Sequence, residues 1–384
     1  MPLPITCKIC PVSSVSDFIK QIEGLRSSSC LFRGEADFYE YNFMRAKALR
    51  SYSNTYDNPR PVDPFFLKMK DFGRYVKHRL TENEQNNFLA FSQHYGIPTN
   101  LFDVTTSPLV ALYFACQPRG RKSTNVWHSK YFIGHKSRCD FGFVYVFRDY
   151  VDITSFIEDA SGQPFNLLEI IFLNNSREYQ EILPMFQDLK ARNPEYFAVL
   201  LDEAKNCYAS DLYHESGCED GFLEVLFDAD PLSAYWGLVR KDESLKFINI
   251  ENVDPDVQLY VALAAFILRQ LQLLQVPLWN IDFLPNFLYR PNLNFERIQN
   301  QKGLFLYQMF YTYPDSLSDV PISPIQRLKM EPILFEIHNK KKILHTLDML
   351  GFNEMTIMSD YDSIAHYINN QDKNHVERHK RKGS

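Results

Sequence analysis

The sequence predicts an α+β fold, and two observations support that prediction. Short apolar runs typical of buried strands lie far apart along the chain, at Ser29–Glu35, Gly142–Arg148 and Leu304–Phe310. Between them lie longer segments whose apolar residues recur at helical spacing. The 384 residues suffice for two or three domains of ordinary size or for one large elaborated domain.

Capping residues, glycine and proline predict where helices begin and end in the first third of the chain. Ser14 or Ser16 can cap a helix that runs to Leu25, and the strand Ser29–Glu35 follows it. The segments 58–80 and 83–95 are expected to be helical, because Gly96 suits a helix end and Pro98 prevents continuation.

A further helix is predicted over Ser107–Cys116. Ser107 suits the N-cap and Pro108 the first helical position, and the segment has almost no polar face. We therefore expect this helix to be buried.

The rest of the chain continues the mixed pattern. Gln258–Gln275 is expected to be a buried helix, and residues 333–352 are expected to form a strand, a helix and a glycine stop. Asp360–Asn369 predicts a final amphipathic helix. Residues 149–249 mix helical patterns with few turn signals.

Composition excludes several classes of protein. The net charge of −6 argues against general binding to a polyanion, and no apolar stretch is long enough for a membrane span. The N-terminus lacks the pattern of a signal peptide, so a cytoplasmic protein without a membrane partner is expected. Seven cysteines with one C-x-x-C, Cys7 to Cys10, indicate reduced thiols and predict no metal site.

The first polar cluster is Arg33-Gly34, at the end of a predicted strand. Arginine offers a rigid donor fork suited to phosphate or carboxylate, and glycine allows a ligand or a backbone to approach closely. The alternative is a structural arginine paired with an internal acid.

The second cluster lies between residues 94 and 107. His94 and Asp103 flank a loop framed by apolar residues, and Thr105, Thr106 and Ser107 directly precede a helix N-terminus, where free N–H groups attract anions. These groups are either satisfied structural groups or site residues.

A third cluster precedes the strand Leu304–Phe310. Arg297, Gln299, Asn300 and Gln301 either complete turns at the strand entrance or face the same cavity as Arg33.

Four segments in this order resemble the FRG domain family, named for its Phe-Arg-Gly motif. They are "LFRGEADFYEYN", "QHYGIPTNLFDVTTSPLVALYFA", "RPNLNFERIQNQKGLFLY" and "KKKILHTLDMLGFNEMTIMSDYDSIAHYI". The resemblance touches most of the chain, so it implies one elaborated FRG domain over residues 1–384. Residues 149–249 would be a mostly helical insertion within it.

A weaker resemblance is to the ADP-ribosyltransferase fold, which implies a split sheet surrounded by helices. Arg33 would match the strand-end arginine of that fold, and Thr105-Thr106-Ser107 would match its Ser-Thr-Ser-like strand. Gln301 stands roughly where a catalytic glutamate is wanted and supplies no negative charge. The resemblance therefore leaves the catalytic acid open between Asp103 and Glu296.

The same resemblance implies a substrate and the roles of individual residues. NAD would be cleaved at its nicotinamide–ribose bond and ADP-ribose transferred to a macromolecular acceptor, as in a bacterial toxin or an antiviral defence effector. The expected NAD-binding residues include a stacking aromatic, Tyr95 or Phe102. The full expected set is Arg33, Gly34, His94, Tyr95, Phe102, Thr105, Thr106, Ser107 and Arg297, with Gln301, Asp103 and Glu296 as catalytic candidates.

Two other interpretations remain open on the sequence. The same cavity could serve a non-catalytic module that binds a nucleotide, a nucleic acid or a protein. A hydrolase with Asp103 and His94 as acid and base has less support, because no motif places a nucleophile.

Overall fold

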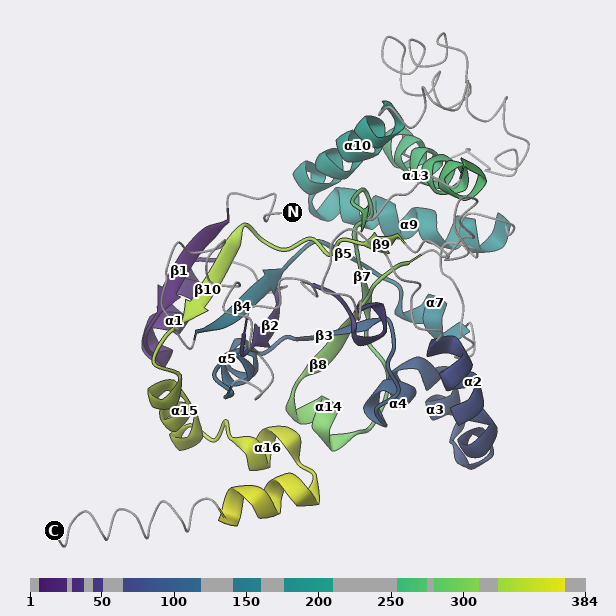
Figure 1. Ribbon diagram of the computed structural model, residues 1–384. Helices are drawn as coiled ribbons and strands as arrows, with labels where there is room; N and C mark the ends of the chain where they lie inside the picture. The colour runs from purple at the N-terminus through teal and green to yellow at the C-terminus, as the bar shows by residue number, and fades with distance from the viewer. Residues whose placement is uncertain are drawn as a thin grey trace, which may run out of the picture.

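A mixed eight-stranded sheet organises the chain, as the computed structural model in Figure 1 shows. The structure describes residues 7–25, 30–37, 44–50, 65–118, 141–159, 176–209, 254–274, 280–310 and 324–369. The strand order is β1-β10-β4-β2-β3-β8-β7-β5, and β6 and β9 form a separate pair. Helices and a mixed sheet in irregular order confirm the predicted α+β class.

The strands are short and come from distant parts of the sequence. Their bounds are β1 Lys8–Val12, β2 Leu31–Glu35, β3 Leu101–Thr105, β4 Gly142–Phe147, β5 Tyr150–Asp152, β6 Asn280–Ile281, β7 Asn286–Tyr289, β8 Gly303–Tyr307, β9 Ile325–Gln326 and β10 Ile333–Ile337. The outermost pairs, β1–β10 and β7–β5, are parallel, and the five pairings between them are antiparallel.

Two four-stranded halves meet at β2 and β3. The register joins these strands through the single residue pair Phe32–Thr105, whereas five pairs join β2 to β4 and five join β3 to β8. All residues of β2 and β3 are among the described residues. The two half-sheets are therefore joined by one register pair between these strands, and we call this place the junction.

Helices cover both faces of the sheet. Their bounds are α1 Val15–Glu23, α2 Phe65–Val76, α3 Glu82–Asn86, α4 Phe88–His94, α5 Pro108–Ala115, α7 Thr154–Asp159, α9 Ser176–Arg192, α10 Pro194–Ala209, α13 Pro255–Leu274, α14 Glu296–Asn300, α15 Lys340–Met349 and α16 Glu354–Met358. Short 3-10 turns occur at η2 Lys47–Leu49 and η3 Lys77–Arg79, and a last helix spans 361–369. None of the described helices is long and apolar enough to cross a membrane.

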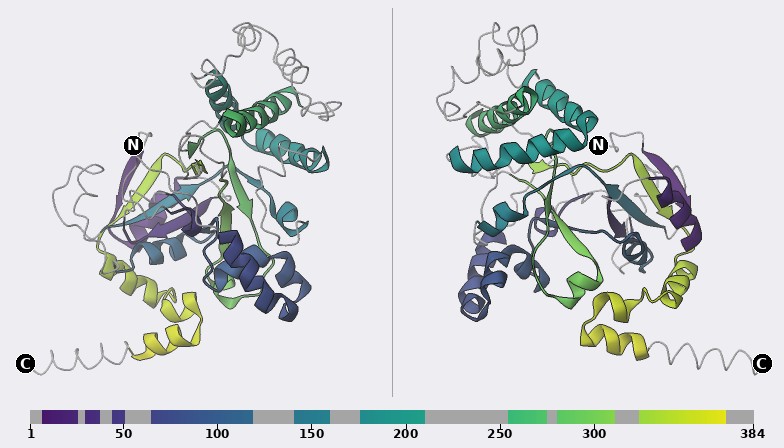
Figure 2. Two further views of the ribbon diagram at one scale, coloured as in Figure 1. Left: turned by 45° about the vertical axis from the view of Figure 1, so that its right-hand side comes forward. Right: turned by 180° about the vertical axis from the view of Figure 1, so that it is seen from behind.

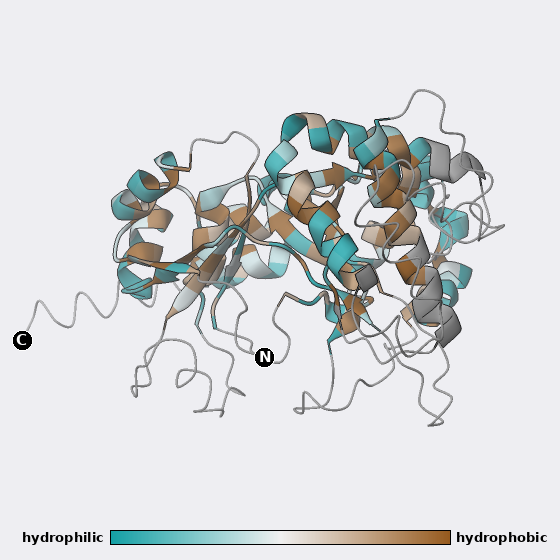
Figure 3. Ribbon diagram, turned by 90° about the horizontal axis from the view of Figure 1, so that it is seen from above, coloured by the Kyte–Doolittle hydropathy of each residue, from teal (hydrophilic) through white to brown (hydrophobic). Residues whose placement is uncertain are grey.

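One face of the sheet packs on α1, α5 and α15 around Phe32, Val144 and Val146. The other face, with Phe102 and Tyr145, belongs to a larger core that receives α4, α9, α10 and α13. Helices α9, α10 and α13 lie at the opposite end of the molecule from α15 and α16 (Figure 2). In Figure 3 the helices carry both teal and brown residues, as amphipathic helices packed on a sheet should.

Helix α5 confirms the sequence prediction in detail. It begins after Ser107, whose side chain accepts a hydrogen bond from the Val110 N–H, and it ends at Cys116. Most of its residues are buried. It can lie against the sheet because a Cβ at Gly34 would fall 1.7 Å from the Ala111 oxygen.

Residues 149–249, which were expected to be a mostly helical insertion, contain both helices and a strand of the main sheet. Helices α7, α9 and α10 agree with the helical expectation, whereas Tyr150–Asp152 is strand β5, at one edge of the main sheet. Residues 160–175 and 210–253 lie outside the described residues.

Candidate functional site

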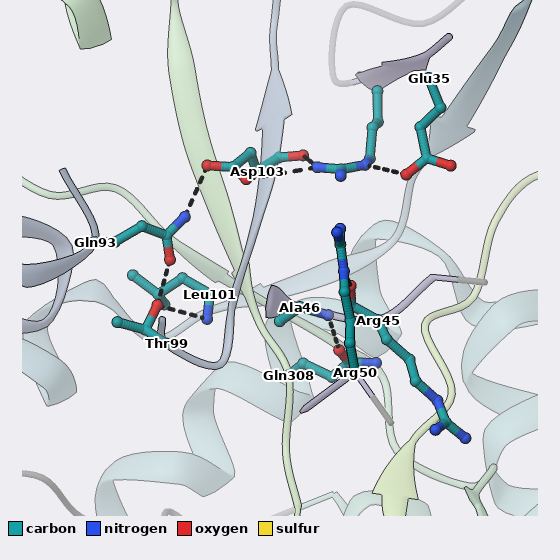
Figure 4. A network of polar contacts seen from close by, with 10 residues as sticks. Glu35, Arg45, Ala46, Arg50, Gln93, Thr99, Leu101, Asp103 and Gln308 are labelled. Atoms are coloured by element: carbon teal, nitrogen blue, oxygen red, sulfur yellow. Dashed lines mark hydrogen bonds and ion pairs between the residues drawn. The ribbon is translucent and has the colours of Figure 1, made fainter. Parts of the chain in front are cut away.

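Arg33 lies on β2, beside the thin junction of the two half-sheets. Its Nε donates a 2.8 Å hydrogen bond to Glu35 Oε1, and its Nη1 donates one of 2.8 Å to the backbone oxygen of Asp103 on β3. The carboxylate oxygen Oδ2 of Asp103 lies 3.6 Å from the same nitrogen. The guanidinium also covers the ring of Phe102, 4.1 Å from its centroid. Figure 4 shows the hydrogen bonds and the ion pair between Asp103 and Glu35 as one line of polar contacts.

This guanidinium is largely buried, and two acids compensate its charge. The side chain of Arg33 is 14% exposed and that of Glu35 is 8% exposed. Burial alone would lower the pKa of Arg33, but the charges of Glu35 and Asp103 outweigh it and hold the pKa above its usual range. Arg33 is therefore a permanent cation paired with an internal acid, Glu35.

Asp103 differs from Arg33, because its side chain is 67% exposed. Gln93, near the end of α4, donates a 2.8 Å hydrogen bond from Nε2 to Asp103 Oδ1. Thr99 in turn donates to Gln93 Oε1 and accepts from the backbone N–H of Leu101. The carboxylate is thus oriented from two sides while it stays open to solvent.

An aromatic group lies at the C-terminal end of α4, the helix that also carries Gln93. The His94 ring stacks on Phe295 with centroids 4.0 Å apart and planes 9° apart, and Tyr95 meets both rings edge-on. Tyr95 is 58% exposed. Burial, and then the charge of Arg297, lower the pKa of His94, so the neutral imidazole is favoured. His94 directly follows Gln93, the residue that donates to the Asp103 carboxylate.

The hydroxyl cluster before α5 is largely used in folding. Thr105 Oγ1 donates a 2.6 Å hydrogen bond to the backbone oxygen of Gln301 and accepts one from the Ser107 N–H. Ser107 is the N-cap of α5, and Thr106 is exposed. The N–H groups of this helix end therefore have a cap of their own.

Gln301 is the C-cap of α14 and precedes strand β8 by two residues. Its Nε2 lies 3.3 Å from the Ile357 oxygen and 3.6 Å from Met358 Sδ, both on α16. Its amide is therefore directed toward the C-terminal helices. Glu296, the other candidate acid from this region, is exposed on α14.

Gly34 separates two alternatives that the sequence left open, the close approach of a ligand or of a backbone. The backbone of α5 lies against Gly34, because a Cβ there would fall 1.7 Å from the Ala111 oxygen. The glycine serves close packing between a helix and a strand.

The structure brings together some of the predicted residues and adds two. Arg33 contacts Phe102 and Asp103, and His94 contacts Tyr95 and is within reach of the charge of Arg297. The Thr105 hydroxyl donates to the backbone oxygen of Gln301 and accepts from the Ser107 N–H. Sequence reasoning missed Gln93 and Glu35. Each adjoins a residue that was singled out, so adjacency was the available signal. Among the described residues, no group of three or more His, Cys, Asp and Glu is arranged to hold a metal ion.

Comparison with known proteins gives one result. The family model of the FRG domain matches residues 28–124. No curated protein and no solved structure matches the chain. The matched span includes β2, α2 to α5 and β3, and with them Arg33, Gln93 and Asp103. Residues 28–124 of this chain are therefore similar to the FRG domain, and this span contributes Arg33, Gln93 and Asp103 at the junction of the two half-sheets.

Proposed function

We propose that the chain is an ADP-ribosyltransferase-like enzyme that cleaves the nicotinamide–ribose bond of NAD and transfers ADP-ribose to a macromolecular acceptor. The observation that supports it is the Asp103 carboxylate, exposed at the sheet junction and oriented by Gln93 and Arg33. A fixed negative charge stabilises the positive charge that develops on the ribose as this bond breaks. A toxin or an antiviral defence effector would direct that reaction at a host macromolecule.

The neighbouring residues fit secondary roles in the same reaction. Arg33 is a positioning residue, because its bonds to Glu35 and to the Asp103 backbone fix the strand that carries the carboxylate. Tyr95, exposed beside His94 and Phe295, offers a surface for a flat ring such as nicotinamide. The pKa of His94 is lowered, so the ring adds no positive charge near a cationic substrate at neutral pH.

The test is nicotinamide release and label transfer from NAD, measured on pure protein with and without cell lysate. Asp103→Asn should reduce the rate by a factor on the order of 10²–10³, the usual effect of losing one electrostatic stabiliser. Glu296→Gln, which changes an exposed acid on α14, should keep the wild-type rate. A slower rate for Glu296→Gln than for Asp103→Asn would identify Glu296 as the catalytic acid. The absence of nicotinamide release by the wild-type protein would reject the proposed function.

A second candidate is a non-catalytic nucleotide-binding module. It is favoured by Gln301, which supplies no charge and is directed toward Ile357 and Met358 on α16. Binding of NAD in calorimetry without any nicotinamide release would support this function over the enzyme.

A further inference from the structure

Helix α2 and the 3-10 turn η3 form a basic segment in an acidic protein. The chain has a net charge of −6, whereas residues 65–80 carry one aspartate and five basic residues, Lys68, Lys70, Arg74, Lys77 and Arg79. All five except Lys77 are exposed. The next acids, Glu82 and Glu84, belong to α3, where Glu84 accepts from the Thr81 N–H. An anionic partner therefore meets a local charge opposite in sign to that of the whole chain.

The apolar face of α2 is used in the core. Phe65, Met69 and Gly73 recur every four residues and are buried. Phe72 stacks on Phe88, with ring centroids 6.0 Å apart. Helices α2, α3 and α4 lie together at one side of the molecule (Figure 1). The outward face of α2 is therefore left to its charged residues and lacks the apolar stripe with which a helix enters a lipid surface.

Two exposed tyrosine rings accompany these cations. Tyr75 on α2 is 76% exposed, and Tyr95 is 58% exposed. Phe72 lies between them, because it precedes Tyr75 by three residues on the same side of the helix and its ring centroid is 6.3 Å from that of Tyr95. Arg74 directly precedes Tyr75, and Arg79 follows it by four residues. The surface thus offers flat rings with guanidinium groups beside them.

We infer that this α2–η3 surface, with Arg74, Tyr75 and Arg79, binds single-stranded nucleic acid. The guanidinium groups contact phosphates, and Tyr75 stacks on a base. A base can stack on a protein ring only where it is not enclosed in a duplex, so a single strand fits better than a double one. Arg74 is paired with Asp71 at 2.8 Å, but both side chains are more than half exposed, and such a pair holds the guanidinium weakly. The inference goes beyond the proposed reaction and does not depend on it.

The test measures how labelled oligouridylate and oligothymidylate bind to the full chain, by fluorescence anisotropy over a range of salt concentrations. Arg74→Gln combined with Arg79→Gln should weaken binding by at least about tenfold. It should also reduce the slope of log affinity against log salt by about 1.4, since each phosphate contact on a single strand contributes about 0.7. Tyr75→Ala should weaken binding about fivefold or more, and Tyr75→Phe should retain it, because the ring remains. The control, Lys341→Gln with Lys342→Gln, removes two exposed cations from α15 and should stay near wild type.

The outcomes separate nucleic acid from other anionic partners. Binding of either strand with the expected losses would support the inference, and the tighter strand would identify the ligand as RNA or DNA. No binding by the wild type, or an equal loss in the α15 control, would overturn it. Equal affinity for polyglutamate would show that charge alone acts, and binding only to vesicles of anionic phospholipid would assign the surface to a membrane; both results would also overturn it.

Folding and the proposed enzyme are controlled separately. Melting temperatures of all variants show whether folding is intact, and Tyr75→Leu, which keeps bulk without a flat ring, replaces Tyr75→Ala where the alanine variant unfolds. None of these measurements uses NAD. Failure of nicotinamide release therefore leaves the nucleic-acid surface standing, and failure of oligonucleotide binding leaves the proposed enzyme standing.

Discussion

The Arg33 side chain donates to the backbone oxygen of Asp103 at 2.8 Å, across the junction where β2 and β3 share one residue pair. The Phe32–Thr105 pair is the one register pair between the two strands, and the Arg33 side chain adds a hydrogen bond between them beside it. The Nε of the same guanidinium donates to Glu35 Oε1, two residues along β2. One arginine therefore joins the two half-sheets and sets the position of the strand that carries the exposed carboxylate.

The first prediction concerns the stability that this contact provides. Arg33→Ala should lower the free energy of unfolding by about 3–5 kcal/mol, because it leaves the Glu35 carboxylate buried without its partner. Denaturant unfolding followed by circular dichroism measures the change. Arg33→Met combined with Glu35→Gln should recover most of the loss, since no unpaired charge remains.

A surface ion pair provides the matched control for Arg33. Arg74 Nη1 lies 2.8 Å from Asp71 Oδ1, at the same distance as Arg33 from Glu35, but both side chains are more than half exposed. Arg74→Ala should therefore cost less than about 1 kcal/mol. Similar small losses for Arg33→Ala and Arg74→Ala would show that the junction does not depend on Arg33.

The second prediction concerns Gly34. Gly34→Ala should destabilise the protein by at least about 1–3 kcal/mol, the usual cost of overpacking, because the new methyl group would meet the Ala111 oxygen. Gly24→Ala is the control, since its Cβ would lie 3.4 Å from the nearest atom and the residue has helical dihedrals. Thermal unfolding should show a lowered transition for the first variant and an unchanged or raised one for the second. A wild-type transition in Gly34→Ala would contradict the close approach of α5.

Several elements were predictable because their signals are local. Ser107 and Pro108 predict the start of α5, and the apolar run Leu31–Phe32 predicts β2. Strand β1 was missed, because Pro11 argues against a strand, although an edge strand tolerates proline. Strand β3 was missed because Asp103 interrupts its apolar residues with a polar side chain that faces solvent.

The candidate site was predictable only in part, because its contacts join distant residues. Arg33 and Asp103 are 70 residues apart, so the sequence could mark each as a candidate without showing that they bind each other. The direction of the Gln301 amide depends on α16, more than fifty residues later. Gly34 showed that a close approach was needed, but whether a helix or a ligand makes it depends on tertiary packing.

The third prediction concerns the segment 44–50. Gln308→Ala should destabilise this segment, because the Ala46 N–H and the Met44 and Gln326 oxygens lose their partner in the core. Each buried group left unsatisfied costs about 1–3 kcal/mol. Limited proteolysis should cut near residues 44–50 faster in Gln308→Ala than in the wild type. Gln299→Ala, on the exposed surface of α14, should leave the cleavage rate unchanged, and equal rates in all three proteins would contradict the anchoring role.

The last prediction concerns the charge of His94. Burial and Arg297 lower the pKa of His94 below its ordinary value of 6.5, so the folded protein holds the neutral ring while the unfolded chain takes up a proton first. The contribution of His94 to the free energy of unfolding is therefore fully present above pH 6.5, and it is lost as the pH falls below 6.5. Arg297→Gln should raise the pKa of His94 in an NMR titration, because one of the two causes is removed. Arg290→Gln, which changes a cation paired with Asp152 elsewhere on the sheet, should leave the titration unchanged. A His94 signal that titrates alike in the wild type and in Arg297→Gln would show that burial alone sets the protonation state beside Tyr95.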